Sequence, residues 1–524
     1  MIHKAHMANT KTTNLKYLVS TLIIMTSMPG ANAAELINPS VFFMKPCLLN
    51  PESENEISAL CADLELKENR DQPSSRLITL PLVYVPATDV KGSDIPLFLL
   101  QGGPGASNIW NNPKSWMYRR QPLVMVGYRG ADGSSTLLCP DLTKGQLGLG
   151  NNLTSSESKA LFASHVFDCS VDLQKQGFDL NQYTMMQVIE DIEEVRKKLG
   201  VDKINLLSES YGTRVAYIYG RKYPGVINRS VMIGVNPPGH FVWEPTLIDE
   251  QLNYMSRLCE VDTWCNQRTD NLAGSIRKVV RTMPDSWFGF PIDPGKVRFL
   301  AMNFLHNVGG AAIIYDIFLA ADQGDHSGLA LLTLMYNLQM YIGTSQPMGD
   351  LFSKGMVDYE PSRDYGKDMY PPESIMGSAM SELLMAAGPM WPHSEFPAEY
   401  RKIETSAVNT LMINGSIDFS TPIQNARNEL LPILTNGHLV ELKEMGHVGD
   451  VYNRQPAATE HLVLTYFKNG IVDKSKFENE PFNFVADNSF PLFMKLGLLI
   501  LVFMASLLVL LVCWVVKIVS NKVA

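Results

Sequence analysis

Short apolar runs that end in glycine turns alternate with amphipathic stretches along most of this chain. The runs RLITLPLVYVPA, IPLFLLQGGPGAS and PLVMVGYRGADGSS are each typical of a strand followed by a loop. The stretch YTMMQVIEDIEEVRKKLG differs, because its apolar residues recur every three or four positions and indicate one face of a helix that ends at Gly200. That face is formed by Met186, Ile189, Ile192, Val195 and Leu199.

The runs KINLLSES and SVMIGV, which flank another helical stretch, are also typical of strands. Further strands are predicted in NTLMING and HLVELKEMG. Strands that alternate with helices predict an α/β fold with a mostly parallel sheet and flanking helices. Between them, residues 241–400 are rich in Met, Trp and Pro, have a mainly helical pattern and show no clear strand. We therefore expect a core over residues 34–240 and 401–475, an inserted helical lid over 241–400, and a polar linker over 476–495.

The two ends of the chain are apolar in different ways. Residues 1–33 combine a basic start, a short apolar run and small residues at Ala31 and Ala33, as a secretory signal peptide does. The uncharged run Leu496–Val516 is long enough, at about 1.5 Å per residue, to cross a hydrocarbon core of about 30 Å. We expect a single transmembrane helix over 496–516 and a cytosolic tail over 517–524. The body is then anchored outside the cytosol, on the periplasmic or extracellular side.

Charge narrows the possible partners. The net charge of -9 comes from scattered acidic residues. The sequence has no block of basic residues that could bind along a phosphate backbone. Nucleic acid is therefore not expected as a partner, whereas a lipid bilayer is.

The chain has seven cysteines, and all except Cys513 lie in the body that we expect to be exported. An even number of cysteines in an oxidising compartment predicts disulfides, although the sequence leaves their pairing open. We favour pairs of sequence neighbours, namely Cys47 with Cys61, Cys139 with Cys169, and Cys259 with Cys265. No Cys or His spacing is typical of a zinc site, so no metal is expected.

A serine stands between a buried strand and a helix in INLLSESYGTRVA, residues 204–216. At the nucleophile elbow of the α/β-hydrolase fold, strand and helix come so close that the residues two before and two after the serine must be small. Around Ser210 these are Ser208 and Gly212, whereas Ser208 itself would have Leu206 in one of these positions. The spacing predicts Ser210 as the nucleophile and Ser208 as a substitute for the usual glycine. A serine that only caps the helix is the structural alternative.

The turn QGGPG, residues 101–105, follows a strand upstream of this elbow. Without a side chain, Gly102 or Gly103 can bring its backbone N–H close to a substrate oxygen. Together with the N–H of Tyr211, it would form an oxyanion hole for a tetrahedral intermediate. An ordinary Gly-Pro turn is the alternative.

An acid and a base follow the two strands after the lid. Asp418 lies in NGSIDFSTP and His447 lies in KEMGHVGD, so the chain order Ser, Asp, His is that of α/β-hydrolases. In such a triad the histidine takes the serine proton and later gives it to the leaving group, while the carboxylate orients the imidazole. We predict Ser210, Asp418 and His447 as the triad, with no metal or organic cofactor.

These motifs together resemble the α/β-hydrolase serine peptidases related to prolyl iminopeptidase and, more closely, the tripeptidyl aminopeptidase branch. The resemblance rests on ALCADLELKENRD, GGPGAS, YRGADGSS, LLCPDL, the stretch around SESYGTRVAYIYG, NGSIDFSTP and EMGHVG. It implies the same triad, with Gly103 and Tyr211 as oxyanion donors, and a helical cap that restricts access to the pocket. Family members remove residues from free peptide N-termini. This chain departs from the family at Ser208, at Tyr128, and in its C-terminal apolar segment.

An aminopeptidase also needs an anion for the ammonium group of its substrate, and the sequence does not single one out. Glu209 beside the nucleophile is one possibility, and Glu244 and Asp249 in the lid are others, although each could have a structural role instead.

We thus expect an exported, membrane-anchored serine hydrolase, most simply an aminopeptidase of prolyl or tripeptidyl type that acts on peptides through an acyl-enzyme. A carboxylic-ester hydrolase of the same fold is the alternative, because one triad serves both reactions. An inactive hydrolase domain used for adhesion or docking is a third possibility.

Overall fold

The computed structural model describes residues 43–51, 56–89, 91–145, 152–342, 346–392 and 396–523. The signal peptide predicted over residues 1–33 lies outside the described residues.

The described chain forms a sheet in the order β1-β2-β3-β5-β4-β6-β7-β10-β11. The strands are β1 (Lys45–Leu49), β2 (Ile57–Lys67), β3 (Leu77–Val85), β4 (Leu97–Leu100), β5 (Leu123–Val126), β6 (Ile204–Glu209), β7 (Ile227–Ile233), β10 (Thr410–Gly415) and β11 (Gly437–Leu442). Pairs from β1 to β5 are antiparallel, and pairs from β5 through β11 are parallel. The central strands β4, β5, β6 and β10 are buried along their whole length, which explains why they are apolar without alternation.

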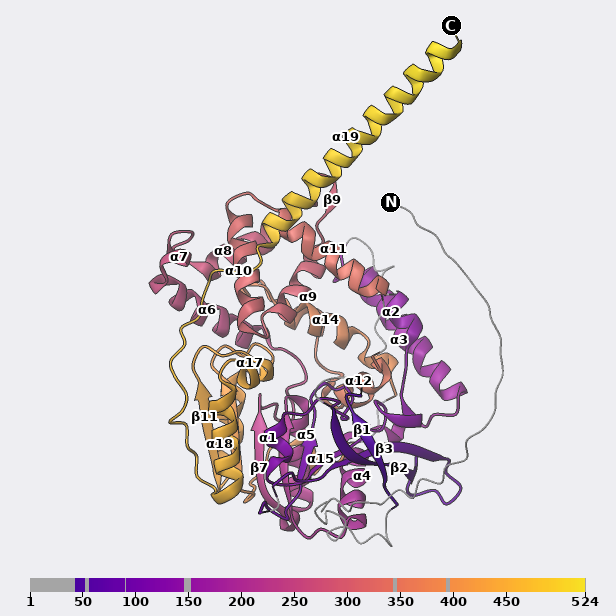
Figure 1. The fold of residues 1–524 in the computed structure, drawn as a ribbon, viewed down its shortest axis with the longest axis vertical. Helices are drawn as coiled ribbons and strands as arrows, with labels where there is room; N and C mark the ends of the chain where they lie inside the picture. Colours follow the sequence, from indigo (N-terminus) through magenta and orange to yellow (C-terminus); the bar gives the residue numbers. More distant parts are fainter. Residues whose placement is uncertain are drawn as a thin grey trace, which may run out of the picture. The chain divides into compact units, whose positions relative to one another are not determined.

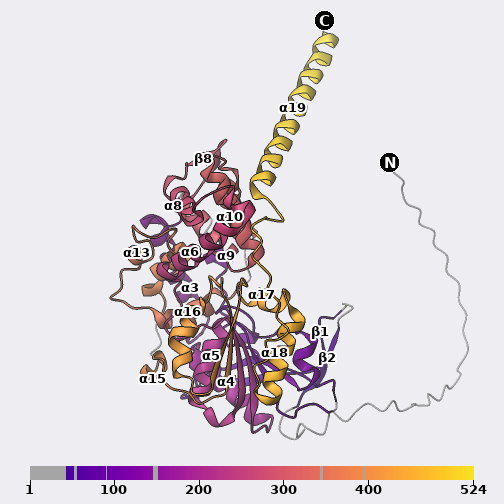
Figure 2. The same ribbon diagram turned by 90° about the vertical axis from the view of Figure 1, so that its left-hand side faces the viewer.

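Helices cover both faces of this sheet (Figure 2). On one face lie α4 (Met185–Lys198) and α5 (Tyr211–Lys222), and on the other lie α1 (Ser115–Arg119), α17 (Val448–Asn453) and α18 (Pro456–Asn469). The predicted helix that ends at Gly200 is α4, and Gly200 has the positive φ of +68° typical of a helix end. The predicted α/β-hydrolase fold is confirmed.

The segment between β7 and β10 is mainly helical, and most of its helices pack over one end of the sheet (Figure 1). Its last residues, which include Phe396 and Tyr400, pack instead against the core formed by α4 and α5. Its helices are α6 (Pro245–Val261), α7 (Thr263–Asn266), α8 (Leu272–Thr282), α9 (Pro294–Phe304), α10 (Val308–Asp322), α11 (Ser327–Ile342), α12 (Met348–Gly355), α13 (Tyr365–Asp368), α14 (Ala379–Ala386) and α15 (Ala398–Arg401). A short α16 (Ile423–Asn425) follows β10. We call the part between β7 and β10 the lid.

Two features of the lid differ from the sequence prediction. A hairpin of two-residue strands, β8 (Ser286–Trp287) and β9 (Phe290–Pro291), interrupts the helices, although we expected no strand before residue 409. Strands this short contain no full hydrophobic period, so their pattern is invisible in sequence. In addition, α2 (Pro140–Gly145) and α3 (Ser156–Lys175) share one apolar core with the lid helices, although they precede the predicted lid by many residues.

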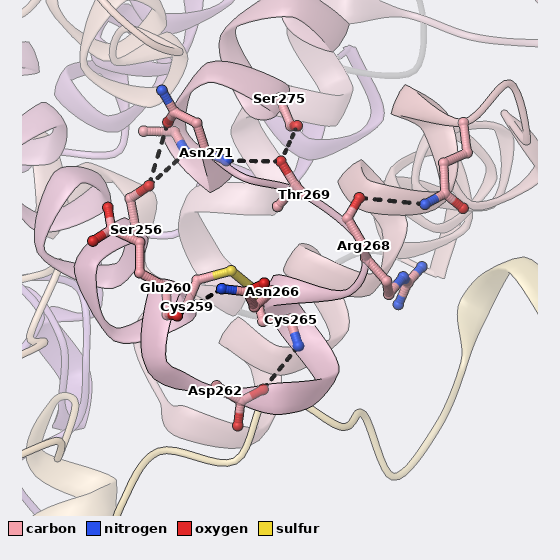
Figure 3. Close-up of a disulfide and its surroundings, with 12 residues drawn as sticks. Ser256, Cys259, Glu260, Asp262, Cys265, Asn266, Arg268, Thr269, Asn271 and Ser275 are labelled. Carbon is pink, nitrogen blue, oxygen red and sulfur yellow. Dashed lines mark hydrogen bonds between the residues drawn. A yellow bond between two sulfur atoms is a disulfide. The ribbon is translucent and has the colours of Figure 1, made fainter.

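Among the described residues there are three disulfides, and each joins neighbouring elements. Cys47–Cys61 connects β1 to β2, Cys139–Cys169 connects the start of α2 to α3, and Cys259–Cys265 connects α6 to α7. Around Cys259–Cys265 the corner is also closed by hydrogen bonds (Figure 3). The Asp262 carboxylate caps α7 by accepting from the Cys265 N–H at 2.8 Å. These pairs are the ones that sequence proximity favoured.

The C-terminal helix α19 (Phe490–Val523) leaves the body from the lid (Figure 1). Within the described residues it is the helix that is long and apolar enough to cross a membrane. Its base is tied to the turn between α10 and α11, because Lys495 pairs with Asp325 at 2.8 Å and the Ser327 hydroxyl donates to the Pro491 carbonyl at 3.2 Å.

Candidate active site

Ser210 occupies the sharp turn between β6 and α5. Its φ of +51° lies in the left-handed region, which is strained for a residue with a side chain. Its N–H donates to the Ile233 carbonyl at the end of β7, at 2.9 Å, which holds the turn to the sheet. This is the elbow geometry that the sequence predicted for Ser210.

The two small neighbours of Ser210 are needed for different reasons. A Cβ on Gly212 would lie 2.2 Å from the Leu100 carbonyl oxygen, so no side chain fits between α5 and β4. Ser208 is fully buried, and its hydroxyl donates to the Val231 carbonyl at 3.1 Å. This hydroxyl is therefore engaged inside the sheet, which is compatible with a packing role for Ser208.

The glycine turn after β4 closely approaches Ser210. A Cβ on Gly102 would lie 2.9 Å from the Ser210 Cβ, so only glycine allows this approach. The next residue, Gly103, has a φ of +111° and precedes Pro104 through a cis peptide bond. Tyr211 opens α5, and the N–H groups of a first helical turn have no partner within the helix. The turn and the helix start can therefore supply backbone donors on one side of Ser210.

A buried network holds this glycine turn in place. The Asn108 side chain, with no exposed surface, accepts from the Gln101 N–H at 2.8 Å and donates to the Leu99 and Val126 carbonyls. The Asp132 carboxylate in turn accepts from the N–H groups of Asn108 and Tyr128, at 3.0 and 2.7 Å. Tyr128, one of the departures from the family pattern, is thus bound through its backbone and packs as a buried ring.

The lid also contacts the glycine turn directly. Asp350 in α12 is fully buried and accepts from the Gly105 N–H at 3.0 Å. Its charge is balanced by Lys354 one helical turn later, at 2.5 Å, and Lys354 also donates to the Arg129 carbonyl at 3.0 Å. A buried carboxylate needs such a partner to remain charged.

Asp418 and His447 meet beyond the ends of β10 and β11. The His447 Nδ1 lies 2.8 Å from an Asp418 carboxylate oxygen, and Asp418 has no exposed surface. The Thr421 hydroxyl donates to the same carboxylate oxygen at 2.8 Å, while the N–H groups of Ser420 and Thr421 donate to the other oxygen at 2.9 Å each. The carboxylate is therefore fixed on both oxygens and faces the imidazole.

In the Asp418–His447 pair, each residue stabilises the charged form of the other. Burial alone would lower the pKa of His447, but the charge and hydrogen bond of Asp418 raise it above the ordinary histidine value. Burial alone would raise the pKa of Asp418, but His447 and Thr421 hold it below the ordinary value. An anionic carboxylate that stabilises an imidazolium is what a general base next to a serine requires.

The end of β7 brings Ser210 and His447 into one neighbourhood. Ile233, the last residue of β7, accepts from the Ser210 N–H, and Gly234 follows with a φ of +64°. A Cβ on Gly234 would lie 2.8 Å from the His447 ring carbon Cε1. Gly234 is a site residue that sequence reasoning missed, although its place directly after a buried strand could have drawn attention to it.

Hydrogen bonds between the lid and the loop that carries His447 are a second feature that the sequence did not predict. The His447 N–H donates to the His306 carbonyl at 2.7 Å, and His306 lies in the lid between α9 and α10. The Asp450 carboxylate accepts from the N–H groups of Val308 and Gly446 through one oxygen, at 2.9 and 2.8 Å. The loop that carries His447 is thus bonded to the lid on both sides.

The side chain of His306 lies beside His447, with ring centroids 6.0 Å apart. Burial lowers the pKa of His306 to about 4, so the ring is neutral at pH 7. Its Nε2 is buried and has no hydrogen-bond partner among the described residues. No sequence motif pointed to this residue.

Glu209, considered above for the substrate amine, is 6% exposed and accepts from the Tyr452 hydroxyl at 2.7 Å. Burial raises its pKa more than the Tyr452 hydrogen bond and the charge of His447 lower it, so that the pKa is about 7. The two lid acids also have partners, because Glu244 pairs with Arg363 through both oxygens, at 2.7 and 2.8 Å, and Asp249 accepts from the Ile375 N–H at 2.9 Å. All three acids therefore have internal partners.

Two family models match parts of this chain. The family model of the alpha/beta hydrolase fold matches residues 95–259, which include Ser210, and the model described as TAP-like protein matches residues 373–478, which include Asp418 and His447.

Two curated relatives are similar over part of their length. Tripeptidyl aminopeptidase of Streptomyces lividans is 25% identical over 178 residues, 31% of this chain and 33% of that protein. Serine protease Hip1 of Mycobacterium tuberculosis is 27% identical over 209 residues, 36% of this chain and 38% of that protein. The matched part of this chain thus spans about a third of the length of these relatives. Among solved structures, a thermophilic esterase from Thermogutta terrifontis is 14% identical with a TM-score of 0.36, covering 78% of this chain and 99% of that chain.

Proposed function

This chain is an α/β hydrolase with a TAP-like C-terminal part, and from that premise we propose that it is a membrane-anchored serine aminopeptidase. The observation that carries the proposal is the strained Ser210 at the end of β6, combined with the Asp418–His447 pair beyond β10 and β11. Strain at a residue of this kind is typical of a functional position.

In the proposed reaction, His447 takes the proton of the Ser210 hydroxyl as the oxygen attacks the peptide carbonyl. Asp418 holds the imidazole at Nδ1, so the free Nε2 is the nitrogen that works as the base. The tetrahedral oxyanion accepts hydrogen bonds from the Tyr211 N–H and from Gly102 or Gly103. Collapse of the intermediate releases the amine product, which takes its proton from His447. Water activated by the same histidine then releases the acyl group from Ser210.

Peptides are the proposed substrates because the curated relatives are named as an aminopeptidase and a protease. The preference for tripeptidyl or prolyl substrates is left to experiment, because Glu209, Glu244 and Asp249 all have internal partners. Three disulfides are typical of an oxidising compartment, which supports a body on the outer side of the membrane that α19 crosses.

A substrate comparison tests the proposal. The full chain in detergent should release arylamine from tripeptide or prolyl arylamides with a free N-terminus. It should do so much faster than from the same compounds with an acetylated N-terminus. The variant S210A serves as the control for background hydrolysis. Turnover of an unactivated alkyl ester, with none of the free-amine arylamides, would overturn the aminopeptidase assignment in favour of an esterase.

A further inference from the structure

The β8–β9 hairpin of the lid presents an aromatic side chain to the outside. Phe288 at its turn is 79% exposed. It has a φ of +46° and is followed by Gly289 at +82°, so the tight turn places a bulky residue in the left-handed region. This conformation is costly for a side chain with a Cβ, and Phe288 gains little burial from the protein in return.

The flanking aromatics fix the position of this tip. Trp287 and Phe290 are partly buried against the core of the lid. The Trp287 ring meets the Phe288 ring edge-on, with centroids 5.0 Å apart. The hairpin therefore projects from the lid, is held by the packing of Trp287 and Phe290, and exposes the Phe288 ring beside Trp287.

The hairpin and the base of α19 are attached to the same helix, α11. Two residues after β9, the Asp293 N–H donates to the Thr333 hydroxyl in the middle of α11 at 3.0 Å. At the start of α11, the Ser327 hydroxyl donates to the Pro491 carbonyl of α19 at 3.2 Å. Both views show the hairpin at the end of the lid from which α19 leaves (Figures 1 and 2).

The apolar surface of α19 begins beside this same region. Lys495, the last charge before the apolar run, pairs with Asp325 in the turn that precedes α11. A bilayer that holds α19 from Leu496 onward therefore meets the lid near α11 and the hairpin. Tryptophan and other aromatic residues are enriched at the interface between bilayer and water, because the ring is apolar while its edge can remain hydrated.

We propose that the β8–β9 hairpin inserts its aromatic tip into the interfacial layer of the bilayer that α19 crosses, as a second membrane contact of the lid. The inference rests on the membrane anchoring in the proposed function, and it does not depend on the peptidase activity. One helix alone leaves the body free to turn about its axis, whereas a second contact fixes which side of the lid faces the lipid.

The test uses the full native chain in phosphatidylcholine vesicles that contain a lipid with a photoactivated carbene precursor near its headgroup. After illumination, the labelled peptides are identified by mass spectrometry. We expect the peptide that contains Phe288 to be labelled several-fold more than the peptide that contains Leu77. Leu77 is also exposed, at 60%, but lies on β3 in the sheet. A second vesicle preparation carries the precursor deep in the acyl chain and should label α19.

Two variants sharpen this test. Phe288→Asp should reduce labelling of the hairpin to the Leu77 level and leave labelling of α19 unchanged. Val261→Asp alters a lid residue of similar exposure, 83%, and should leave the hairpin labelled. An unchanged melting temperature of each variant shows that the fold persists.

The outcomes separate the two proposals. Labelled α19 with a hairpin at the Leu77 level overturns the hairpin inference and leaves the anchor intact. Absence of labelling in α19 overturns the anchoring, and the hairpin inference with it. A hairpin that is protected from a water-soluble carbene probe yet unlabelled by lipid is covered by protein, such as a second copy, which also overturns the inference.

Discussion

Replacement of Gly234 by alanine tests the placement of His447, because it adds one methyl group and leaves the polar groups of the site unchanged. The new Cβ would lie 2.8 Å from the His447 Cε1 and 3.0 Å from its Nδ1. It would also lie 3.1 Å from the hydroxyl oxygen of Thr421, which holds Asp418. The substitution thus pushes on the proposed base His447 and on the hydroxyl that supports Asp418, and it removes no functional group.

The structure sets the size of the expected effect. The contact with Cε1 is about 0.6 Å shorter than the 3.4 Å at which ordinary van der Waals contact begins, so the ring must move by roughly that distance. A misplacement of about 1 Å in an active site costs on the order of 100-fold in rate. We therefore expect kcat/KM to fall about tenfold to 100-fold.

A matched control variant separates the effect of the steric contact from the stability lost by placing alanine at a positive φ. Gly239 has a φ of +90°, like Gly234 in the left-handed region, but no atom lies within 4 Å of a Cβ placed there. Both alanine variants should lose about 1–2 kcal/mol of folding stability from the positive φ. Only Gly234→Ala should also lose activity.

The assay combines thermal unfolding with hydrolysis of a peptide arylamide by each variant. Values of kcat/KM for Gly234→Ala within twofold of those for Gly239→Ala would show that the His447 ring tolerates the contact, and that Gly234 is not needed to place it.

Three further predictions concern other contacts of the site and the fold. Asp450→Asn removes a charged acceptor of two hydrogen bonds and should lower the free energy of unfolding by about 1.5–3 kcal/mol. It should also lower kcat by more than the unfolded fraction of the variant explains. Denaturant titration and steady-state kinetics on the same variant check both effects. Glu209→Gln removes a carboxyl group whose ionised form raises the pKa of His447, and because the pKa of Glu209 is about 7, only part of that charge is present where His447 titrates. The acidic limb of the kcat/KM profile should therefore move modestly to lower pH; a limb that stays in place or moves to higher pH contradicts the assignment. Loss of the Cys139–Cys169 disulfide, which closes a loop of 30 residues, should cost about 3.6 kcal/mol on the chain-entropy estimate, and an unchanged urea midpoint would exclude a stabilising role.

The main strands and the elbow could be predicted from sequence because each is determined locally. The run KINLLSES is a fully buried strand, β6, and the steric need for small neighbours distinguishes Ser210 from Ser208 within three residues. The glycine turn after β4 is likewise a local signal.

The remaining parts of the site depend on contacts that no local pattern carries. Asp450 contacts Val308, 142 positions away, and Tyr452 contacts Glu209, 243 positions away. In the same way, α2 and α3 join the lid core only because the fold brings distant segments together. Amphipathic periodicity shows that a helix has a buried face, but it does not show which partner covers that face.

The most direct test of the central claim is the site of covalent labelling by a fluorophosphonate, which reacts with an activated serine. We expect a single adduct on Ser210, lost in Ser210→Ala and retained in Ser208→Ala, because the Ser208 hydroxyl donates to the Val231 carbonyl inside the sheet. An adduct on Ser208, or labelling that persists undiminished in Ser210→Ala, would contradict it.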